Sequence, residues 1–256
     1  MEAIQKYAQD KKISENEATQ VFLQVLVLKH VSLEQTRFMG GTALVMGYGN
    51  PRFSEDIDLT HVSSPFSLAA GLKSGVKEAS EWLHAEIKLK EPKKNMRSWV
   101  ITYSFNPAHI VRLHIDTQPY RAYTTRPIVI EFPSLTSFVC NALTLEEILA
   151  EKILALAFRK YLGGRDLFDL WFHWLRKSDW FTQESEIYPL VELKLKERKL
   201  DKKVFNQNIK TRLLTKPILN RARLEWNRYL PTEFQKESVF RDITDSNKKL
   251  LSLLNK

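Results

Sequence analysis

The spacing of apolar residues divides the chain into two parts that fold in different ways. In the first part, segments in which apolar and polar residues alternate predict β-strands, because alternate side chains of a strand point to opposite faces. These predicted strands cover residues 56–62, 99–105, 111–116 and 127–132. From Leu143 onward, apolar residues recur at helical spacing instead. The pattern predicts an α+β domain over residues 1–135 and an α-helical domain over residues 140–256.

Helices in the first part are predicted from a capping signal and from apolar runs. Ser14 and Glu17 fit a capping box, and the apolar run at 21–31 behind them predicts a buried helix. Residues 67–90 are also predicted to be helical. The two strands that follow are expected to form a hairpin around Asn106–Pro107.

The second part begins with a strong helix signal. Thr144 and Glu147 fit another capping box at the start of a helix that Gly163–Gly164 breaks. An aromatic-rich helix is predicted over residues 165–175. The remainder is predicted to be helices separated by polar loops.

Composition restricts the class of protein. The chain has 256 residues, of which 43% are hydrophobic and 27% charged, as in ordinary globular proteins. Cys140 is the only cysteine, which excludes a disulfide scaffold and fits a reducing cytoplasm. No export segment is expected, and the most apolar stretch, at 153–158, is too short to span a bilayer. We therefore expect a cytoplasmic protein without a membrane partner.

The positive charge is concentrated at the end of the chain. Residues 1–190 carry 22 basic and 22 acidic side chains, whereas residues 191–256 carry 17 basic and 8 acidic ones. A neutral body with a basic tail suggests a polyanionic partner, most simply nucleic acid. The alternative is a solvated helical face that only aids solubility.

Paired carboxylates are the most informative candidates for chemistry. Asp56 and Asp58 lie two residues apart on a predicted strand, so both point to the same side. Such a pair suits Mg²⁺, which takes one or two carboxylates together with substrate phosphates. Asp116 supplies a third carboxylate if its strand pairs beside that of Asp58. The alternatives are a solvated strand face for the pair and a strand-end turn residue for Asp116.

Other polar groups lie near these carboxylates in the sequence. Gly40 and Gly41 form a turn before a short helix, an arrangement that lets the backbone approach a phosphate. Arg52 and Ser54 add a cation and a hydroxyl between this turn and Asp56. The short helix is expected to end at Asn50–Pro51, because proline disfavours helix at the residue before it.

A lysine and two aspartates mark the helical part. Lys152 lies on the apolar face of its predicted helix, where it either extends to the edge of that face or meets a buried anion. Asp166 and Asp169, three residues apart, lie on one side of the next helix. Their alternative role is local, with Asp166 capping that helix and Asp169 favouring its dipole.

Two of these segments resemble motifs of a known family. FMGGTALVMGYGNPRFSEDIDL (38–59) and EEILAEKILALAFRKYLGGRDLFDL (146–170) resemble motifs of the AbiEii/AbiGii-type toxin nucleotidyltransferases, in the DNA polymerase β-like superfamily. They cover about 50 residues; the loop before Asp56 is at the long end of the superfamily pattern. The resemblance implies a nucleotidyltransferase-fold domain, with a small mixed sheet flanked by helices, before the helical domain.

The resemblance also implies roles for the candidate residues. Asp56 and Asp58 would hold Mg²⁺ or Mn²⁺, and Asp116 would orient or deprotonate the attacking hydroxyl. Catalytic roles would extend to Lys152 and Asp169. The NTP substrate would be bound by Gly40, Gly41, Arg52, Ser54, Lys152 and Asp166.

The acceptor of the nucleotide is a separate question. The resemblance implies the toxin of a toxin–antitoxin or phage-defence pair, acting on RNA such as the 3′ end of tRNA, with a cognate antitoxin as partner. Basic residues in 191–256 suit RNA. The alternatives are a protein or small-molecule acceptor, and a catalytically silent RNA- or partner-binding protein. Ser54 is a candidate for inhibitory modification, because a phosphate there would repel the carboxylates.

Overall fold

The chain folds into two compact units that are each continuous in space but not in sequence. The computed structural model describes residues 2–31, 36–106, 109–177 and 180–253. The first unit comprises residues 1–47 and 54–143, and the second comprises residues 48–53 and 144–256. A short segment between two parts of the first unit therefore belongs to the second.

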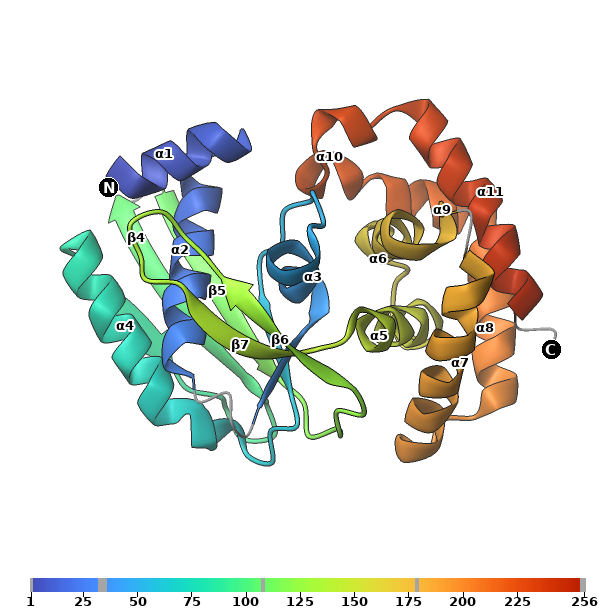
Figure 1. The fold of residues 1–256 in the computed structure, drawn as a ribbon, viewed down its shortest axis with the longest axis horizontal. Coiled ribbons are helices and arrows are strands. Elements are labelled where there is room, and N and C mark those ends of the chain that lie inside the picture. Colours follow the sequence, from blue (N-terminus) through green and yellow to red (C-terminus); the bar gives the residue numbers. More distant parts are fainter. Residues whose placement is uncertain (1, 32–35, 107–108, 178–179, 254–256) are drawn as a thin grey trace. The chain divides into compact units, whose positions relative to one another are not determined.

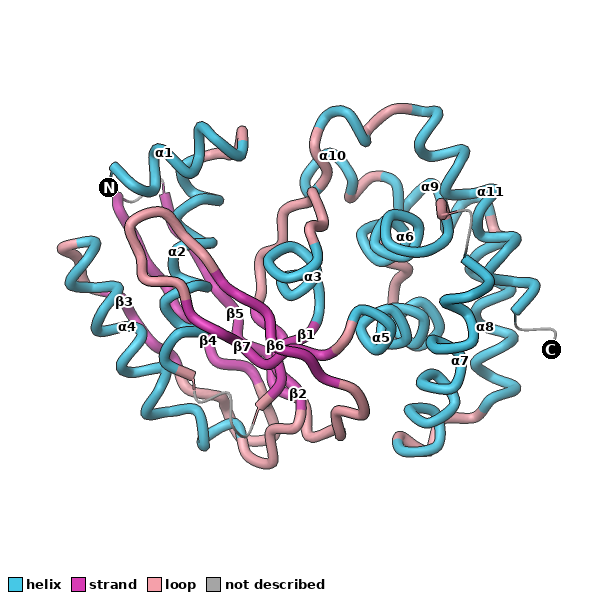
Figure 2. The backbone as a smooth tube through the Cα atoms, viewed as in Figure 1, coloured by secondary structure: helices cyan, strands magenta, loops and turns pink. Residues whose placement is uncertain are grey.

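The first unit is built on a seven-stranded mixed sheet with the strand order β3-β4-β5-β2-β1-β7-β6 (Figure 2). The pairs β1–β7 and β2–β5 are parallel, and the other neighbours are antiparallel. The strands are β1 (Arg37–Met39), β2 (Ile57–Thr60), β3 (Ile87–Lys90), β4 (Ser98–Asn106), β5 (His109–Thr117), β6 (Thr125–Ile130) and β7 (Phe138–Leu143).

Helices pack against this sheet and against each other (Figure 1). Helix α2 contacts α1, α4, β5 and β7, which explains why it is apolar on nearly every side. The predicted capping box is confirmed: the Ser14 backbone donates to Glu17 at 2.8 Å, and the Glu17 backbone donates to Ser14 Oγ at 3.2 Å. The helical elements are α1 (Glu2–Lys11), α2 (Glu15–His30), α3 (Gly40–Tyr48), a 3₁₀ turn (Pro65–Leu68) and α4 (Ala69–Leu83).

The predicted strands are confirmed, and so is the hairpin of β4 and β5, which pairs Asn106 with His109. The predicted turn at residue 107 lies outside the described residues. The predicted helix at 67–90 is wrong at its end, because α4 stops before His84, whose φ is 48°. Residues Ile87–Lys90 instead form β3, with alternating burial, against β4.

The second unit is helical. Thr144 Oγ1 accepts a hydrogen bond from the Glu147 backbone at 3.4 Å and so caps α5, as predicted. The Glu147 carboxylate bonds to Lys194 of α7 at 2.6 Å, and both side chains are buried. The elements are α5 (Leu145–Phe158), α6 (Gly164–Leu170), a π-helical turn (Trp171–Leu175), α7 (Trp180–Glu197), α8 (Lys202–Leu214), α9 (Lys216–Arg223), α10 (Trp226–Tyr229), a 3₁₀ turn (Thr232–Phe234) and α11 (Glu237–Leu253).

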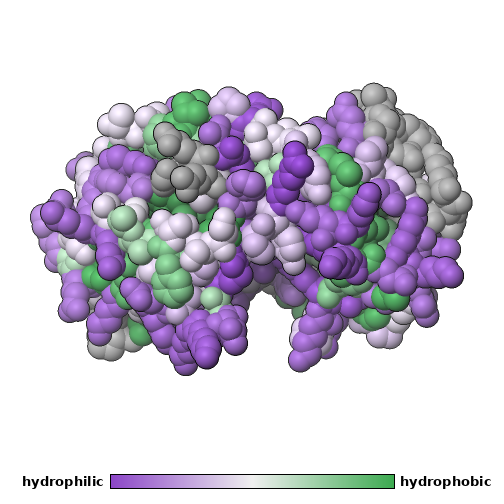
Figure 3. Space-filling view, turned by 90° about the horizontal axis from the view of Figure 1, so that it is seen from below, coloured by the Kyte–Doolittle hydropathy of each residue, from purple (hydrophilic) through white to green (hydrophobic). Residues whose placement is uncertain are grey.

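The fold class predicted from the sequence is confirmed, with a mixed sheet flanked by helices and a helical second part. The units divide after Leu143, because β7 pairs with β1 and β6 and so belongs to the sheet. Hydrophilic residues predominate on the face shown in Figure 3, and hydrophobic ones form small patches. None of the helices in the described part of the chain is long and apolar enough to cross a membrane.

Candidate active site

A glycine turn lies directly against one of the predicted carboxylates. Strand β1 pairs with β2 so that Met39 lies opposite Asp58, and the chain then turns into α3 at Gly40. Gly40 has a φ of +76°, which side chains rarely adopt. A Cβ atom at this position would lie 2.0 Å from Asp58 Oδ2. Only glycine therefore allows this turn and this carboxylate to meet.

Two of the three predicted carboxylates lie side by side on the sheet. Parallel pairing of β2 and β5 places Asp58 opposite Asp116, as the sequence predicts if these strands are neighbours. Both residues are half-buried, whereas Ile57 and Ile115 beside them are fully buried and point to the other face. Asp56 lies immediately before β2. The pairing brings Asp116 onto the same face as Asp58.

The chemistry of these donors fits a divalent cation. Carboxylate oxygens are the hard ligands that Mg²⁺ prefers, and the ion takes one or two of them when phosphates complete its shell. Across the described residues, no group of three or more His, Cys, Asp or Glu side chains is arranged as a ready-made metal site. Asp56 and Asp58 are the residues that would hold such a cation.

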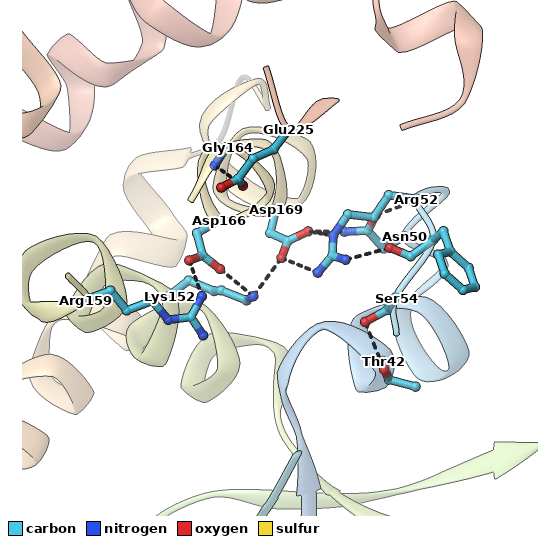
Figure 4. Close-up of polar contacts among 11 residues, drawn as sticks. Thr42, Asn50, Arg52, Ser54, Lys152, Arg159, Gly164, Asp166, Asp169 and Glu225 are labelled. Atoms are coloured by element: carbon cyan, nitrogen blue, oxygen red, sulfur yellow. Dashed lines mark hydrogen bonds and ion pairs between the residues drawn. The ribbon is translucent and has the colours of Figure 1, made fainter. Parts of the chain in front are cut away.

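The segment that leads into β2 is held by hydrogen bonds to α2 and α3. Thr42 Oγ1 lies 2.9 Å from Ser54 Oγ and also bonds to the Asp56 carbonyl (Figure 4). Gln24 Nε2 donates to the carbonyls of Ser54, at 3.0 Å, and Glu55, at 2.9 Å. Ser54 itself is only 8% exposed. Thr42 and Gln24 thus fix the backbone next to Asp56, a role that no local sequence signal indicates.

The second unit contains a buried ion cluster, formed by Arg52, Lys152, Asp166 and Asp169 (Figure 4). Lys152 Nζ lies 2.7 Å from Asp166 Oδ1 and 2.9 Å from Asp169 Oδ2. Arg52 binds Asp169 through two nitrogens, Nε at 2.6 Å and Nη2 at 2.8 Å. Of the two predictions for Lys152, contact with a buried anion is the one that is confirmed.

Both carboxylates of the cluster are ionised because of their cations. Burial alone would raise the pKa of Asp166, but the charges of Lys152 and Arg159 outweigh it and lower that pKa. Burial likewise opposes ionisation of Asp169, and the charges of Arg52 and Lys152 hold its pKa well below the usual range. The cluster is therefore a set of mutually dependent charges, in which removing one leaves another unpaired.

Two polar residues complete the cluster. Asn50 Nδ2 donates to Asp169 Oδ1 at 2.9 Å, and Arg159 Nη1 lies 2.7 Å from Asp166 Oδ2. The sequence indicated Asn50 only as a helix end, and Arg159 gave no signal. The Arg52 guanidinium binds Asp169, whereas its expected position near Asp56 and Asp58 stays a prediction.

The aspartates reach Lys152 because of their helical spacing. Asp166 and Asp169 lie one turn apart on α6 and bind the same ammonium group, which confirms that they share one side. The residue that caps this helix is Gly163, so the capping alternative for Asp166 is wrong. Both carboxylates are fully buried, which suits a role in holding cations rather than in touching a substrate.

Two other reactive residue types, a histidine and the cysteine, are buried. His173 is buried in the π-helical turn, and burial lowers its pKa to about 4. Cys140 is buried in β7, and burial raises its pKa to about 12, so the thiol stays protonated. At neutral pH the His173 imidazole is therefore uncharged and the Cys140 thiol is protonated; a structural role for His173 stays a prediction.

Comparison with solved structures identifies the class of this fold. A protein from H. pylori, described as a candidate nucleotidyltransferase, has a TM-score of 0.53 and 16% identity, covering 95% of each chain. MenT4, a nucleotidyltransferase toxin from Mycobacterium tuberculosis H37Rv, has a TM-score of 0.50 and 14% identity, covering 94% of this chain and 85% of that chain. The fold is that of nucleotidyltransferases.

The family follows from the sequence match. A sequence model of the family described as nucleotidyl transferase AbiEii toxin, type IV TA system, matches residues 22–246. The chain belongs to this family of toxin nucleotidyltransferases. The resemblance drawn from the two motifs is thereby confirmed over most of the chain. No curated protein matches it.

Replacing Gly40 tests the contact between the glycine turn and Asp58. We expect Gly40→Ala to lower the free energy of unfolding by more than about 2 kcal/mol and to reduce nucleotidyl transfer, because the new Cβ displaces the carboxylate. Gly49→Ala is the matched control, since Gly49 has a φ of +69° but no atom within 4 Å of its Cβ position. Urea unfolding of both variants that gave equal losses would contradict the clash.

Proposed function

We propose that this protein is a Mg²⁺-dependent toxin that transfers a nucleoside monophosphate from an NTP to an RNA acceptor, such as the 3′ end of tRNA. The observation that carries the proposal is the contact of the Gly40 turn with Asp58, beside which Asp116 lies in register. Phosphate-binding backbone and paired carboxylates are the two parts that this chemistry needs. Membership of the toxin nucleotidyltransferase family supports the same reaction.

In this proposal each group of the first unit has one task. The acceptor hydroxyl attacks the α-phosphorus, a new P–O bond forms, and the bond to the β-phosphate breaks to release pyrophosphate. Asp116 takes the proton of the attacking hydroxyl. Gly40, Gly41 and Ser54 position the phosphates, and Asp56 with Asp58 would hold the cation. A bound divalent cation supplies charge neutralisation on the phosphates.

The buried ion cluster has a supporting task in this proposal. Lys152 and Arg52 are held by Asp169, and Lys152 is also held by Asp166. A positioned cation costs no reorganisation when charge develops on a phosphate. We therefore propose that Asp166 and Asp169 position Lys152, which is our candidate for the contact with the nucleotide triphosphate.

The proposed acceptor and partner rest on charge and family. Residues 191–256 carry 17 basic and 8 acidic side chains, which favours a polyanion such as RNA. The type IV toxin–antitoxin family makes an antitoxin the expected protein partner. Ser54 remains our candidate for inhibitory modification, and its burial requires the segment to open before a modifying enzyme reaches it.

A labelling assay tests the proposal. The protein, Mg²⁺ and each α-³²P-labelled NTP are incubated with total tRNA, and in parallel with tRNA whose 3′ hydroxyls have been destroyed by periodate. Label on intact tRNA only supports transfer to the 3′ end. Label on both samples would move the acceptor elsewhere in the RNA. Label found only on protein or on small molecules would show that the acceptor is not RNA. The absence of label from every fraction would overturn the proposed activity.

A further inference from the structure

The loop between α5 and α6 places an exposed aromatic ring among cations. Tyr161 is 52% exposed, and the Arg221 guanidinium of α9 lies over its ring, 4.3 Å from the centroid. Lys160 Nζ lies 5.2 Å from the same centroid. We call Lys160, Tyr161 and Arg221 the Tyr161 platform. It presents a ring, a planar cation and a point charge on the surface of the second unit.

The charges of this platform are not neutralised locally. Within the described parts of the chain, neither Lys160 nor Arg221 has a carboxylate at ion-pair distance. A different lysine–tyrosine contact shows the contrast: Lys202 lies 5.7 Å from the Tyr188 ring centroid, but it is paired with Glu192 at 2.9 Å. The Tyr161 platform therefore keeps two positive charges for a partner, whereas the Tyr188 contact does not.

The platform is also held in place by packing. A Cβ atom at Gly164 would lie 1.9 Å from the Ala222 carbonyl, so α9 lies directly on the start of α6 next to Arg221. The Gly164 backbone donates to Glu225 at 2.9 Å and fixes the same contact. Because α9 packs against the start of α6, directly after the loop, the Tyr161 ring and the Arg221 guanidinium keep their relative positions without a ligand.

The loop leads from the platform to the buried ion cluster. Arg159, two residues before Tyr161, has a side chain that is 48% exposed, yet its Nη1 bonds to buried Asp166. The other oxygen of Asp166 binds Lys152. A ligand on the platform would therefore lie on the segment that connects the two helices of the cluster.

We propose that the Tyr161 platform binds an unpaired nucleotide of the RNA acceptor. Its base stacks on the Tyr161–Arg221 pair, and the Lys160 ammonium neutralises its phosphate. Bases in single-stranded RNA stack on aromatic rings and on guanidinium planes, and lysine or arginine charges bind their phosphates. The identity of the ligand as RNA rests on the proposed function.

Binding assays with two RNAs test this site. A hairpin with a single-stranded 3′ overhang is compared with the same hairpin with a blunt end, both without NTP. We expect Tyr161→Ala to weaken binding of the overhang RNA about 10-fold or more, and Tyr161→Phe to keep most of the affinity. Arg221→Gln should weaken binding and make it less dependent on salt. Lys202→Gln, which removes a charge already paired with Glu192, should change little.

The outcomes separate this inference from its rivals. The inference is overturned if Tyr161→Ala and the parent bind the overhang RNA equally well. It is also overturned if Tyr161→Ala loses as much affinity for the blunt hairpin as for the overhang RNA, or if the parent binds neither RNA. A raised KM for NTP with unchanged RNA affinity would assign the site to the NTP instead. The labelling assay of the parent tests the proposed function separately. If RNA binding depends on Tyr161 but no label is transferred, the proposed activity is refuted and the binding site is kept. Matching circular dichroism spectra confirm that the variants are folded.

Discussion

Asp58→Asn should reduce nucleotidyl transfer by about 10³-fold or more without unfolding the protein. The amide has the size of the carboxylate, so the contact with Gly40 and the pairing with β5 are kept. Only one negative charge is lost, and with it the ligand we assign to the cation. The measurement is the rate of label transfer from NTP to RNA at saturating substrates.

Stability gives this variant a second, independent readout. Asp58 and Asp116 lie opposite each other in neighbouring strands, and like charges in that position destabilise a sheet. We therefore expect the Tm of Asp58→Asn to stay the same or to rise while activity falls. Asp10→Asn, on the exposed surface of α1, is the control and should change neither quantity. Activity within about 10-fold of the parent would exclude Asp58 from the cation site.

Asp169→Asn should destabilise the helical unit by about 3–5 kcal/mol. The substitution leaves Arg52 buried without its bidentate partner and removes one of the two carboxylates on Lys152. For a protein of this size the loss corresponds to a decrease in Tm of roughly 6–20 °C. Thermal unfolding followed by circular dichroism measures it.

Matched variants show whether this loss comes from burial. Asp245→Asn removes the carboxylate of an exposed pair with Lys248, at 3.0 Å, and should cost less than about 0.5 kcal/mol. The double variant of Arg52→Gln with Asp169→Asn should lose less stability than the sum of the two single changes. Each single change leaves the other charge buried and unpaired, whereas the double variant removes both charges. Strict additivity would show that Arg52 and Asp169 do not depend on each other.

The same cluster predicts how stability changes with pH. The pKa values of Asp166 and Asp169 are lowered in the folded state, against a usual value of 3.8. Such groups stabilise the fold fully above their unfolded pKa, and this contribution is lost as the pH falls through their folded pKa. Stability should therefore fall below about pH 4 in the parent and less steeply in Asp169→Asn.

Local signals in the sequence account for much of the fold. Alternation predicts β4 and β5, and Ser14 and Thr144 mark the starts of their helices correctly. Three strands of the sheet are not predicted, among them β3, which lies in the segment expected to be helical. Strand β1 has three residues, too few for a periodic signal, and β7 (FVCNAL) does not alternate clearly between apolar and polar positions.

The site shows a similar limit. Asp56 and Asp58 lie two residues apart in the sequence, and the pairing of Asp58 with Asp116 needs only two predicted strands to be neighbours. The contact of Arg52 with Asp169 joins residues 117 positions apart, and no periodicity or capping signal indicates it. Contacts between residues this far apart in the sequence depend on the tertiary fold. The partner of Arg52 therefore cannot be predicted from the residues next to it in the chain.

The membership of residues 48–53 in the helical unit has a consequence during synthesis. Arg52 leaves the ribosome 117 residues before Asp169, which at about 5–20 residues per second is a delay of roughly 6–23 s. Until then the segment between α3 and β2 lacks its docking partner. A chain that stops at the end of the sheet would therefore carry Asp56, Asp58 and Asp116 next to an unanchored loop. A protein truncated after Leu143 lacks the unit that residues 48–53 belong to. We therefore do not expect it to act as a minimal toxin.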